Sequence, residues 1–402
     1  MGRSRQHSYR EVKKIEININ KKNLIIRSII AFAALFLAVI LLTNSCSKYL
    51  NRSEYLSIDY PEIADLNGDK HTLFNEEISI NYYYNLEKEQ DTKSNINKKI
   101  KEVLNDNLVH TYQLLDANNK YAENGNEMHN LCYINEHPNE WISVNGELYN
   151  LLLTANTLSN DTEGVYSPFS GVLYQNWNEL FLTESVSKYT PSNDPAFSEI
   201  MSDTIDRIVK AINDPTTNFE FNENNNQVKF NVSESNKRYV KLNLGLLSHA
   251  YMIDKLEPLL IEKGLNSGMI TSTTGIAVSL GSDLQDGYSQ INSTSYQTIY
   301  NGNKVVFDYS FFFNGRVRCM MFNAFNNFSF NSLSEKNYYY FENSEGVQMR
   351  SLILNSKTGY SDNRIHSTFT FSIENSLVTQ LKENYNLYFS NVDSSYFHYT
   401  QH

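Results

Sequence analysis

The stretch Lys241–Gly281 constrains the fold most, because it reads as an extended segment, a helix and a second extended segment. Apolar side chains recur with helical spacing over residues 249–262, and Pro258 is expected to kink that helix. Gly264 stands where helices commonly end, and residues 269–280 then read as extended chain. This succession predicts a domain that combines helices with a sheet.

Composition indicates a large globular domain that is rich in sheet. The chain has 402 residues, of which 41% are hydrophobic, enough to bury a full core as one large domain or as two lobes. Aromatic residues make up 13% of the chain, and they favour half-buried positions in sheets. The formal net charge of −11 argues against a nucleic-acid-binding surface.

Local patterns predict further elements on both sides of this stretch. Alternation of apolar and polar residues indicates strands, a period near 3.6 indicates helices, and the polar run 222–227 indicates a turn between two strands. The predicted strands are 74–84, 141–144, 296–309 and 316–330, and the predicted helices are 95–115, 147–159 and 200–212.

The N-terminal part predicts attachment to a membrane. Residues 1–28 form a basic segment, and residues 29–42 are apolar without interruption. Counting back to Leu24 gives about 20 residues, enough to cross a bilayer if the side chain of Arg27 reaches the interface. Basic residues before such a segment predict a cytoplasmic N-terminus and an extracytoplasmic remainder.

Two interpretations of residues 29–46 stay open. The segment is an uncleaved transmembrane anchor, or it is a lipoprotein signal whose Cys46 becomes lipidated. Under both, the protein belongs to the cell membrane, with its C-terminal domain on the extracytoplasmic side. Residues 47–70 are then expected to form a linker, and residues 71–402 the folded domain.

Cys132 and Cys319 are the cysteines of the predicted extracytoplasmic domain. One interpretation is a disulfide between them, and the other is two separate buried thiols. Their spacing does not match that of a metal site.

Two runs of residues carry a resemblance to one bacterial family. Residues 242–254 read L-N-L-G-L-L-S-H-A-Y-M-I-D, and residues 162–173 read T-E-G-V-Y-S-P-F-S-G-V-L. They resemble L-D-L-G-G-I-A-K-G-Y-A-V-D and T-x-G-A-F-D-P-T-x-G-P-L, which are typical of the ApbE family of bacterial flavin transferases.

Two later runs extend the resemblance in the same order along the chain. Residues 351–360 read S-L-I-L-N-S-K-T-G-Y and resemble the family's H-H-I-x-D-P-[RK]-T-G-Y. Residues 373–381 read I-E-N-S-L-V-T-Q-L and resemble x-x-x-D-A-L-A-T-A-L. The resemblance therefore covers roughly residues 70–390.

The resemblance implies a fold, a reaction and partners. The expected fold is α+β, an ApbE-like domain with a large, mainly antiparallel sheet flanked by helices, preceded here by one hydrophobic N-terminal helix. The implied reaction takes FAD with Mg²⁺ and attaches FMN to a threonine of an exported flavoprotein. That flavoprotein is the expected partner, together with the membrane through the N-terminal segment, and no nucleic acid is expected.

Site residues follow from the resemblance by matching positions. Asn375 and Thr379 fall four residues apart, and they are expected on one face of a helix as two ligands of Mg²⁺. The backbone carbonyl of Ser248 is the implied third ligand. The implied contacts to the flavin nucleotide are Gly245, Ser248, His249, Asp254, Gly275, Thr358 and Gly359.

Polar motif positions depart from the family pattern together. His249 replaces a lysine, Asn375 replaces the metal-binding aspartate, and Leu352 replaces a histidine that can carry a proton. Three hypotheses follow. The chain is a divergent but active FMN transferase, a non-catalytic relative that binds a flavin nucleotide or a surface partner, or a structural surface lipoprotein without a ligand.

Overall fold

The chain divides into two units, Met1–Ser53 and Glu54–His402, and the second contains the elements described below. The predicted basic segment and N-terminal hydrophobic helix, residues 1–46 with Cys46, lie outside the described residues except for residue 30. Within the described ranges, no helix combines the length and the apolar character that a bilayer crossing requires. The computed structural model describes residue 30 and the ranges 53–86, 89–182, 199–281, 289–300, 303–313, 315–323, 338–343, 346–351, 353–361, 367–390 and 397–401.

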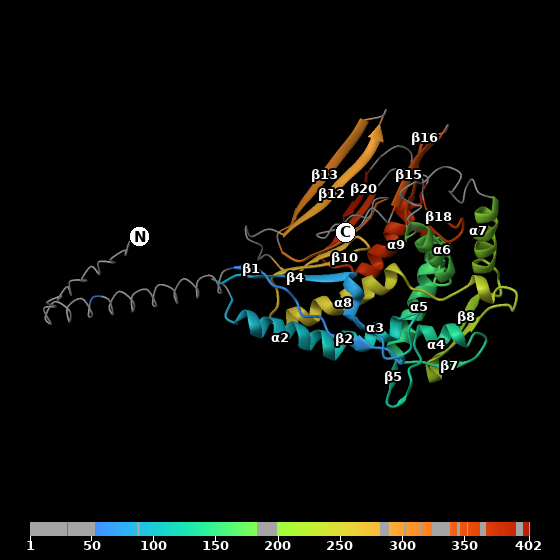
Figure 1. The fold of residues 1–402 in the computed structure, drawn as a ribbon, viewed down its shortest axis with the longest axis horizontal. Helices are drawn as coiled ribbons and strands as arrows, with labels where there is room; N and C mark the ends of the chain where they lie inside the picture. The colour runs from blue at the N-terminus through green and yellow to red at the C-terminus, as the bar shows by residue number, and fades with distance from the viewer. Residues whose placement is uncertain are drawn as a thin grey trace, which may run out of the picture. The chain divides into compact units, whose positions relative to one another are not determined.

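A seven-stranded sheet forms the centre of the second unit, in the order β1-β4-β10-β11-β14-β19-β20 (Figure 1). Neighbouring strands pair antiparallel, except that β20 runs parallel to β19. This confirms the expected large, mainly antiparallel sheet. The strands are β1 (Glu54–Tyr55), β4 (Ile78–Tyr84), β10 (Gly268–Ser272), β11 (Ile276–Ser279), β14 (Val317–Asn323), β19 (Ser367–Ser372) and β20 (Phe397–Gln401).

Helices flank this sheet, as expected (Figure 1). Helix α8 (Leu246–Glu262) contains Pro258 and is followed by Gly264 at φ 77°, which confirms the predicted helix and its end. Helix α9 (Leu377–Tyr388) packs against α8 and also against β14 and β19. The other helices are α2 (Lys93–Val103), α3 (Val109–Leu115), α4 (Leu131–Glu136), α5 (Gly146–Asp161), α6 (Gly171–Leu182) and α7 (Glu199–Ile212).

Shorter strands pair outside the central sheet. The predicted turn at 222–227 joins β8 to β9, and β7 completes that three-stranded sheet. The remaining strands form two-stranded hairpins. These strands are β2 (Glu62–Ala64), β3 (Lys70–Thr72), β5 (Ala122–Glu123), β6 (Asn126–Glu127), β7 (Ile142–Ser143), β8 (Asn218–Asn222), β9 (Gln227–Asn231), β12 (Ser289–Tyr300), β13 (Asn303–Phe313), β15 (Tyr338–Asn343), β16 (Gly346–Ser351), β17 (Leu354–Asn355) and β18 (Tyr360–Ser361).

The central strands β10 and β11 are buried on both faces. Every side chain of both strands is buried, and alternate residues join two different apolar clusters. Ile270 belongs to the main core with the helices, whereas Met269 belongs to a second cluster on the opposite face with Cys319. Cys132 and Cys319 are both buried free thiols, which confirms the interpretation as separate thiols.

Three local differences from the sequence prediction have physical reasons. Strand β4 begins at Ile78, because residues 73–76 form a helical turn with Phe74 at φ 67°. The interval 47–70, predicted as a linker, contributes β1 and β2, and β1 pairs with β4. Residues 242–244 form no strand. Pairing with another segment stops at a single isolated bridge between Lys241 and Ser170.

Candidate functional site

The two motif-like runs, residues 162–173 and residues 242–254, contact each other directly just before α8 begins. The N–H of Gly171 donates to the carbonyl of Lys241 at 2.8 Å, and the N–H of Asn243 donates to the carbonyl of Pro168 at 2.9 Å. A Cβ at Gly171 would lie 2.7 Å from the Lys241 carbonyl oxygen, so this approach requires glycine. Segments about 70 residues apart therefore meet at the start of α8.

The third run, around Thr358 and Gly359, joins the same region. The Trp177 Nε1–H donates to the carbonyl of Gly359 at 2.8 Å, and Gly359 has a φ of 79°. A Cβ at Gly359 would lie 2.4 Å from Cγ2 of Ile205 on α7, so the missing side chain makes room for a helix. Thr358 is exposed on the same turn, where its side chain is accessible to a ligand.

Gly245 starts α8 in a backbone conformation that suits glycine. Its φ is 52° and its ψ −124°, and its N–H donates to Oδ1 of Asn243 at 2.8 Å. Ser248 follows in the first turn of the helix, where its N–H donates to the Gly245 carbonyl at 3.0 Å. Both residues therefore belong to the N-terminal end of α8.

His249 is buried and contacts the turn that contains Gly275. Its Nδ1 lies 2.8 Å from Oγ of Ser272, and its Nε2 lies 3.1 Å from Oε2 of Glu77. Ser272 Oγ in turn lies 2.7 Å from Oγ1 of Thr274. The structure thus brings His249 and the Gly275 turn together through the hydroxyl groups of Ser272 and Thr274, and the carboxylate of Glu77 contacts the other side of the imidazole.

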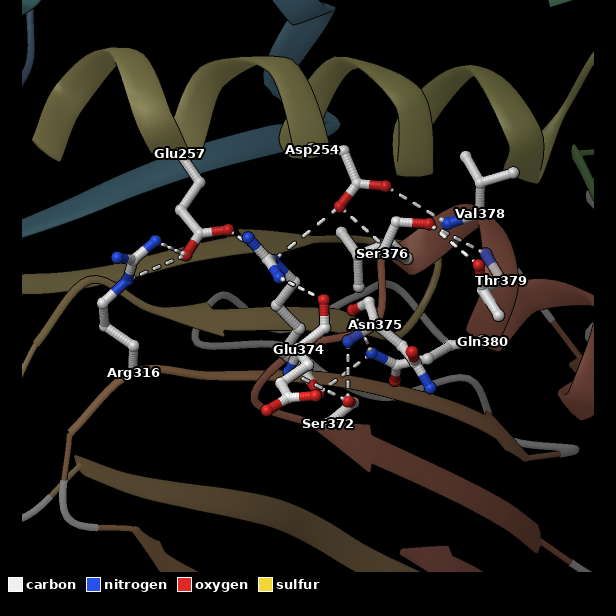
Figure 2. Close-up of polar contacts among 12 residues, drawn as sticks. Asp254, Glu257, Arg316, Ser372, Glu374, Asn375, Ser376, Val378, Thr379 and Gln380 are labelled. Atoms are coloured by element: carbon white, nitrogen blue, oxygen red, sulfur yellow. Dashed lines mark hydrogen bonds and ion pairs between the residues drawn. The ribbon is translucent and has the colours of Figure 1, made fainter. Parts of the chain in front are cut away.

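Asp254 occupies the middle of α8 and caps α9. Figure 2 shows its carboxylate directed toward the first turn of α9, where it accepts the N–H groups of Leu377 at 3.0 Å and Val378 at 3.2 Å. Burial raises the pKa of Asp254 from 3.8 to about 6, against the lowering effect of these two N–H groups and of Arg318. The side chain is held within the protein by these bonds.

The two helices run antiparallel. The N-terminus of α9 lies at Asp254, whereas Tyr385 near its other end packs edge-on against Tyr166 with ring centroids 5.6 Å apart. The hydroxyl of Tyr166 donates to the carbonyl of Leu244, just before α8. The start of α8 therefore lies near the end of α9.

A buried carboxylate next to Asp254 ties α8 to β14. Glu257 is 1% exposed, and its carboxylate lies 3.1 Å from Nη2 of Arg316 and 2.5 Å from Nε of Arg318 (Figure 2). Arg318 also lies 3.9 Å from Asp254. This ion-pair cluster fixes the position of α8 on the sheet.

Asn375 and Thr379 do not share a helix face. Ser376 caps α9, so Asn375 precedes the helix and its N–H donates to Oγ of Ser372 at 2.8 Å (Figure 2). Thr379 is exposed in the first turn, and its N–H donates to Oγ of Ser376 at 3.2 Å. The expectation that both residues lie on one helix face is wrong, because α9 begins after Asn375.

Comparison with known families agrees with the motif runs. The model of the ApbE family matches residues 77–290, more than half of the 402 residues. The chain belongs to the ApbE family. The match includes the run 162–173, helix α8 and the β10–β11 hairpin.

Solved structures of ApbE proteins are similar to this chain at low identity. The ApbE protein from Thermotoga maritima is 17% identical over 81% of this chain and 85% of its own, with a TM-score of 0.48. The flavin transferase ApbE from Vibrio cholerae is 14% identical over 83% and 86%, also with a TM-score of 0.48. The apo Pseudomonas stutzeri flavinyl transferase ApbE is 12% identical over 83% and 85%, with a TM-score of 0.46. The family assignment rests on the family model, and a comparison with curated proteins found no match.

The residues at the ApbE family's Mg²⁺ positions do not fit that ion. Ser248, Asn375 and Thr379 supply no carboxylate, the ligand type that Mg²⁺ favours. Asp254, which meets the start of α9, lies about 9 Å beyond Ser248 along the axis of α8, and the backbone N–H of Asn375 is bonded to Ser372. No three His, Cys, Asp or Glu side chains among the described residues form a metal-binding group. No reaction step is therefore assigned to Mg²⁺.

Sequence patterns did not reveal two polar residues that contact His249. Glu77 lies 172 residues before His249, and only the sheet register, in which Ser272 pairs with Ile78, brings it there. Ser272 is the second of four consecutive hydroxyl residues before Gly275, a concentration that is visible in the sequence. That run could have marked a polar turn, but not its partner.

Proposed function

We propose that this ApbE-family chain binds FAD and transfers its FMN half to a threonine hydroxyl. One observation carries the proposal: the segments that match the family, residues 162–173, α8 and the β10–β11 hairpin, contact one another directly. The proposed FAD contacts are the N-terminus of α8 at Gly245 and Ser248, His249, the Gly275 turn and the exposed Thr358. The proposed acceptor is an exported flavoprotein.

We also propose a location outside the cell membrane for the domain. The support is the basic segment 1–28 followed by the apolar run 29–42. The attachment is an uncleaved anchor or a lipidated Cys46, and a mass measurement on the mature protein from membranes separates the two.

A second candidate function is binding of a flavin nucleotide without transfer. The specific observation in its favour is the donor set Ser248, Asn375 and Thr379, which lacks a carboxylate and is divided between two places. In that case the protein presents a bound nucleotide, or a surface, to a partner.

The experiment is a titration of the full-length chain, purified in detergent, with FAD while flavin fluorescence is followed. The same samples are then incubated with an exported threonine-containing flavoprotein domain, and FMN attachment is measured by mass spectrometry. Binding with attachment supports transfer, and binding without attachment supports the second candidate. Absence of FAD binding overturns both and leaves a structural surface protein.

A matched pair of variants tests where FAD binds. Thr358→Arg and Thr216→Arg both alter an exposed threonine on a turn, and only Thr358 belongs to the proposed site. We expect Thr358→Arg to weaken FAD binding at least tenfold and Thr216→Arg to leave it unchanged. Equal affinities for the two variants would place the nucleotide elsewhere.

A further inference from the structure

Four side chains form one continuous hydrogen-bonded chain beside the β10–β11 turn. Thr274 Oγ1 lies 2.7 Å from Ser272 Oγ, which lies 2.8 Å from Nδ1 of His249. Nε2 of His249 lies 3.1 Å from Oε2 of Glu77. The last three groups, Ser272, His249 and Glu77, have the order hydroxyl, imidazole and carboxylate, which activates hydroxyl nucleophiles in enzymes, and Thr274 extends this order by one more hydroxyl.

Donor and acceptor capacities fix the direction of this chain. An ionised carboxylate only accepts, so in the neutral imidazole the Nε2–H of His249 donates to Glu77 and Nδ1 is the acceptor. Ser272 then donates its O–H to Nδ1 and accepts from both the hydroxyl and the backbone N–H of Thr274, the latter at 3.1 Å. The donated hydrogens therefore run in one direction, from Thr274 through Ser272 and His249 to Glu77.

Backbone contacts hold both ends of this row of hydrogen-bonded side chains in place. Glu77 follows a turn in which Phe74 and Asn75 adopt positive φ values of 67° and 45°, a conformation that costs free energy for residues other than glycine. The N–H of Thr273 donates to the carbonyl of Glu77 at 2.9 Å, which joins that turn to the β10–β11 turn. These four hydrogen-bonded side chains form a relay, and two turns near opposite ends of the family match, residues 77–290, hold it in position.

Exposure separates the two hydroxyl groups. Ser272 is only 2% exposed, whereas Thr274 is half-buried and lies at the tip of the hairpin. Glu77 has a side chain that is 53% exposed, so a proton that reaches His249 has a route to solvent. Thr274 is therefore the hydroxyl that an incoming phosphate group can reach, and Ser272 transmits its proton.

We propose that Thr274 is itself an FMN acceptor, so that this chain flavinylates its own β10–β11 turn. The inference rests on the proposed binding of FAD. Thr274 Oγ1 forms a bond to the phosphorus of the FMN half, and the bond from that phosphorus to the bridging oxygen breaks. AMP leaves with the electron pair, and the threonine proton passes through Ser272 to His249, from which it returns to solvent through Glu77.

The test incubates the full-length chain with FAD alone, without any acceptor protein. Denaturing gels viewed for flavin fluorescence and tandem mass spectrometry of peptides locate covalently bound FMN, while fluorescence titration measures FAD affinity in parallel. Thr274→Val removes the hydroxyl at constant shape, Thr274→Ser keeps a hydroxyl, and Thr216→Val, at an exposed threonine on a turn outside the proposed site, is the matched control. His249→Gln removes the base.

The expected result is FMN on the peptide that contains Thr274, lost in Thr274→Val and retained in Thr274→Ser and Thr216→Val. His249→Gln is expected to slow attachment by about 100- to 10,000-fold, the usual contribution of a general base. FAD binding by the wild-type chain without an adduct, or an adduct on another residue, overturns the self-acceptor and leaves the proposed function standing. Absence of FAD binding overturns both, and an unchanged rate in His249→Gln overturns the relay.

Discussion

The carboxylate of Asp254, in the middle of α8, accepts the backbone N–H of Leu377 in the first turn of α9 at 3.0 Å. It accepts a second N–H from Val378, so one side chain satisfies two of the free donors at that helix end. The motif aspartate, expected from the family resemblance to meet a nucleotide, is thus bonded to the protein's own backbone. Any nucleotide contact at this position would compete with the cap on α9.

Stability should depend on pH through Asp254. Burial raises its pKa from 3.8 to about 6, so the folded state binds more protons than the unfolded state between those values. The unfolding free energy therefore decreases as the pH rises through this window, by ~3 kcal/mol for about two pKa units. Urea denaturation at pH 4 and pH 7 measures it. Asp254→Asn should remove this dependence, whereas Glu262→Gln, at an exposed carboxylate of the same helix, should keep it.

Glu257 should be a sensitive position, because its carboxylate is 1% exposed and is paired with Arg318, which is 17% exposed. Glu257→Gln removes the nearer counter-charge of that guanidinium and leaves only Asp254 at 3.9 Å, and we expect a loss of ~3–5 kcal/mol in the free energy of unfolding. Arg316→Gln is the control, because Arg316 is 47% exposed and its loss should cost only about 0–1 kcal/mol. Equal urea midpoints for the two variants would contradict this account.

Two glycines with similar backbone angles should respond differently to alanine. Gly68 has a φ of 88° and open space around its Cβ position, so Gly68→Ala should cost only the backbone strain of ~1–2 kcal/mol. Gly359 has a φ of 79°, and its Cβ would meet Ile205 at 2.4 Å and Val209 at 2.8 Å. Gly359→Ala should therefore cost a further ~1–3 kcal/mol. Thermal unfolding of both variants decides the matter, and a smaller loss at Gly359 would refute the close contact with α7.

Restoring the family's aspartate should not restore a magnesium site. Asn375→Asp adds a carboxylate before the first turn of α9, but the backbone N–H of residue 375 remains bonded to Ser372, at the end of α9 away from Ser248. We expect no measurable heat when MgCl₂ is titrated into the variant by calorimetry, as for the unchanged chain. Micromolar binding in Asn375→Asp alone would show that Ser248, Thr379 and residue 375 come together after all.

Sequence patterns predicted the elements well where one local rule was sufficient. Apolar spacing located α8 and the pair α2–α3, and Gly264 marked the end of α8. Helix α8 begins three residues before the predicted start, because Leu246 and Leu247 are also buried against the core. Phe74 at a positive φ was not predictable, since a bulky residue rarely adopts that conformation.

The candidate site was predictable by position but not by contact. Motif spacing pointed to His249, Asp254 and Asn375, yet it could not indicate that Asp254 caps α9 or that Asn375 precedes it. These outcomes depend on where α9 begins, and a cap from a residue 123 positions away leaves no local pattern. Glu77 was missed for the same reason, because only the pairing of β4 with β10 brings it to His249.

The double-sided burial of β10 and β11 restricts how this protein can meet another one. Because side chains on both faces of these strands are already covered, an incoming acceptor has no flat sheet surface to dock on there. Recognition would instead have to occur at the rim, where hairpin tips and helix ends reach solvent, and a narrow, extended segment would be better suited to that approach than a broad folded face.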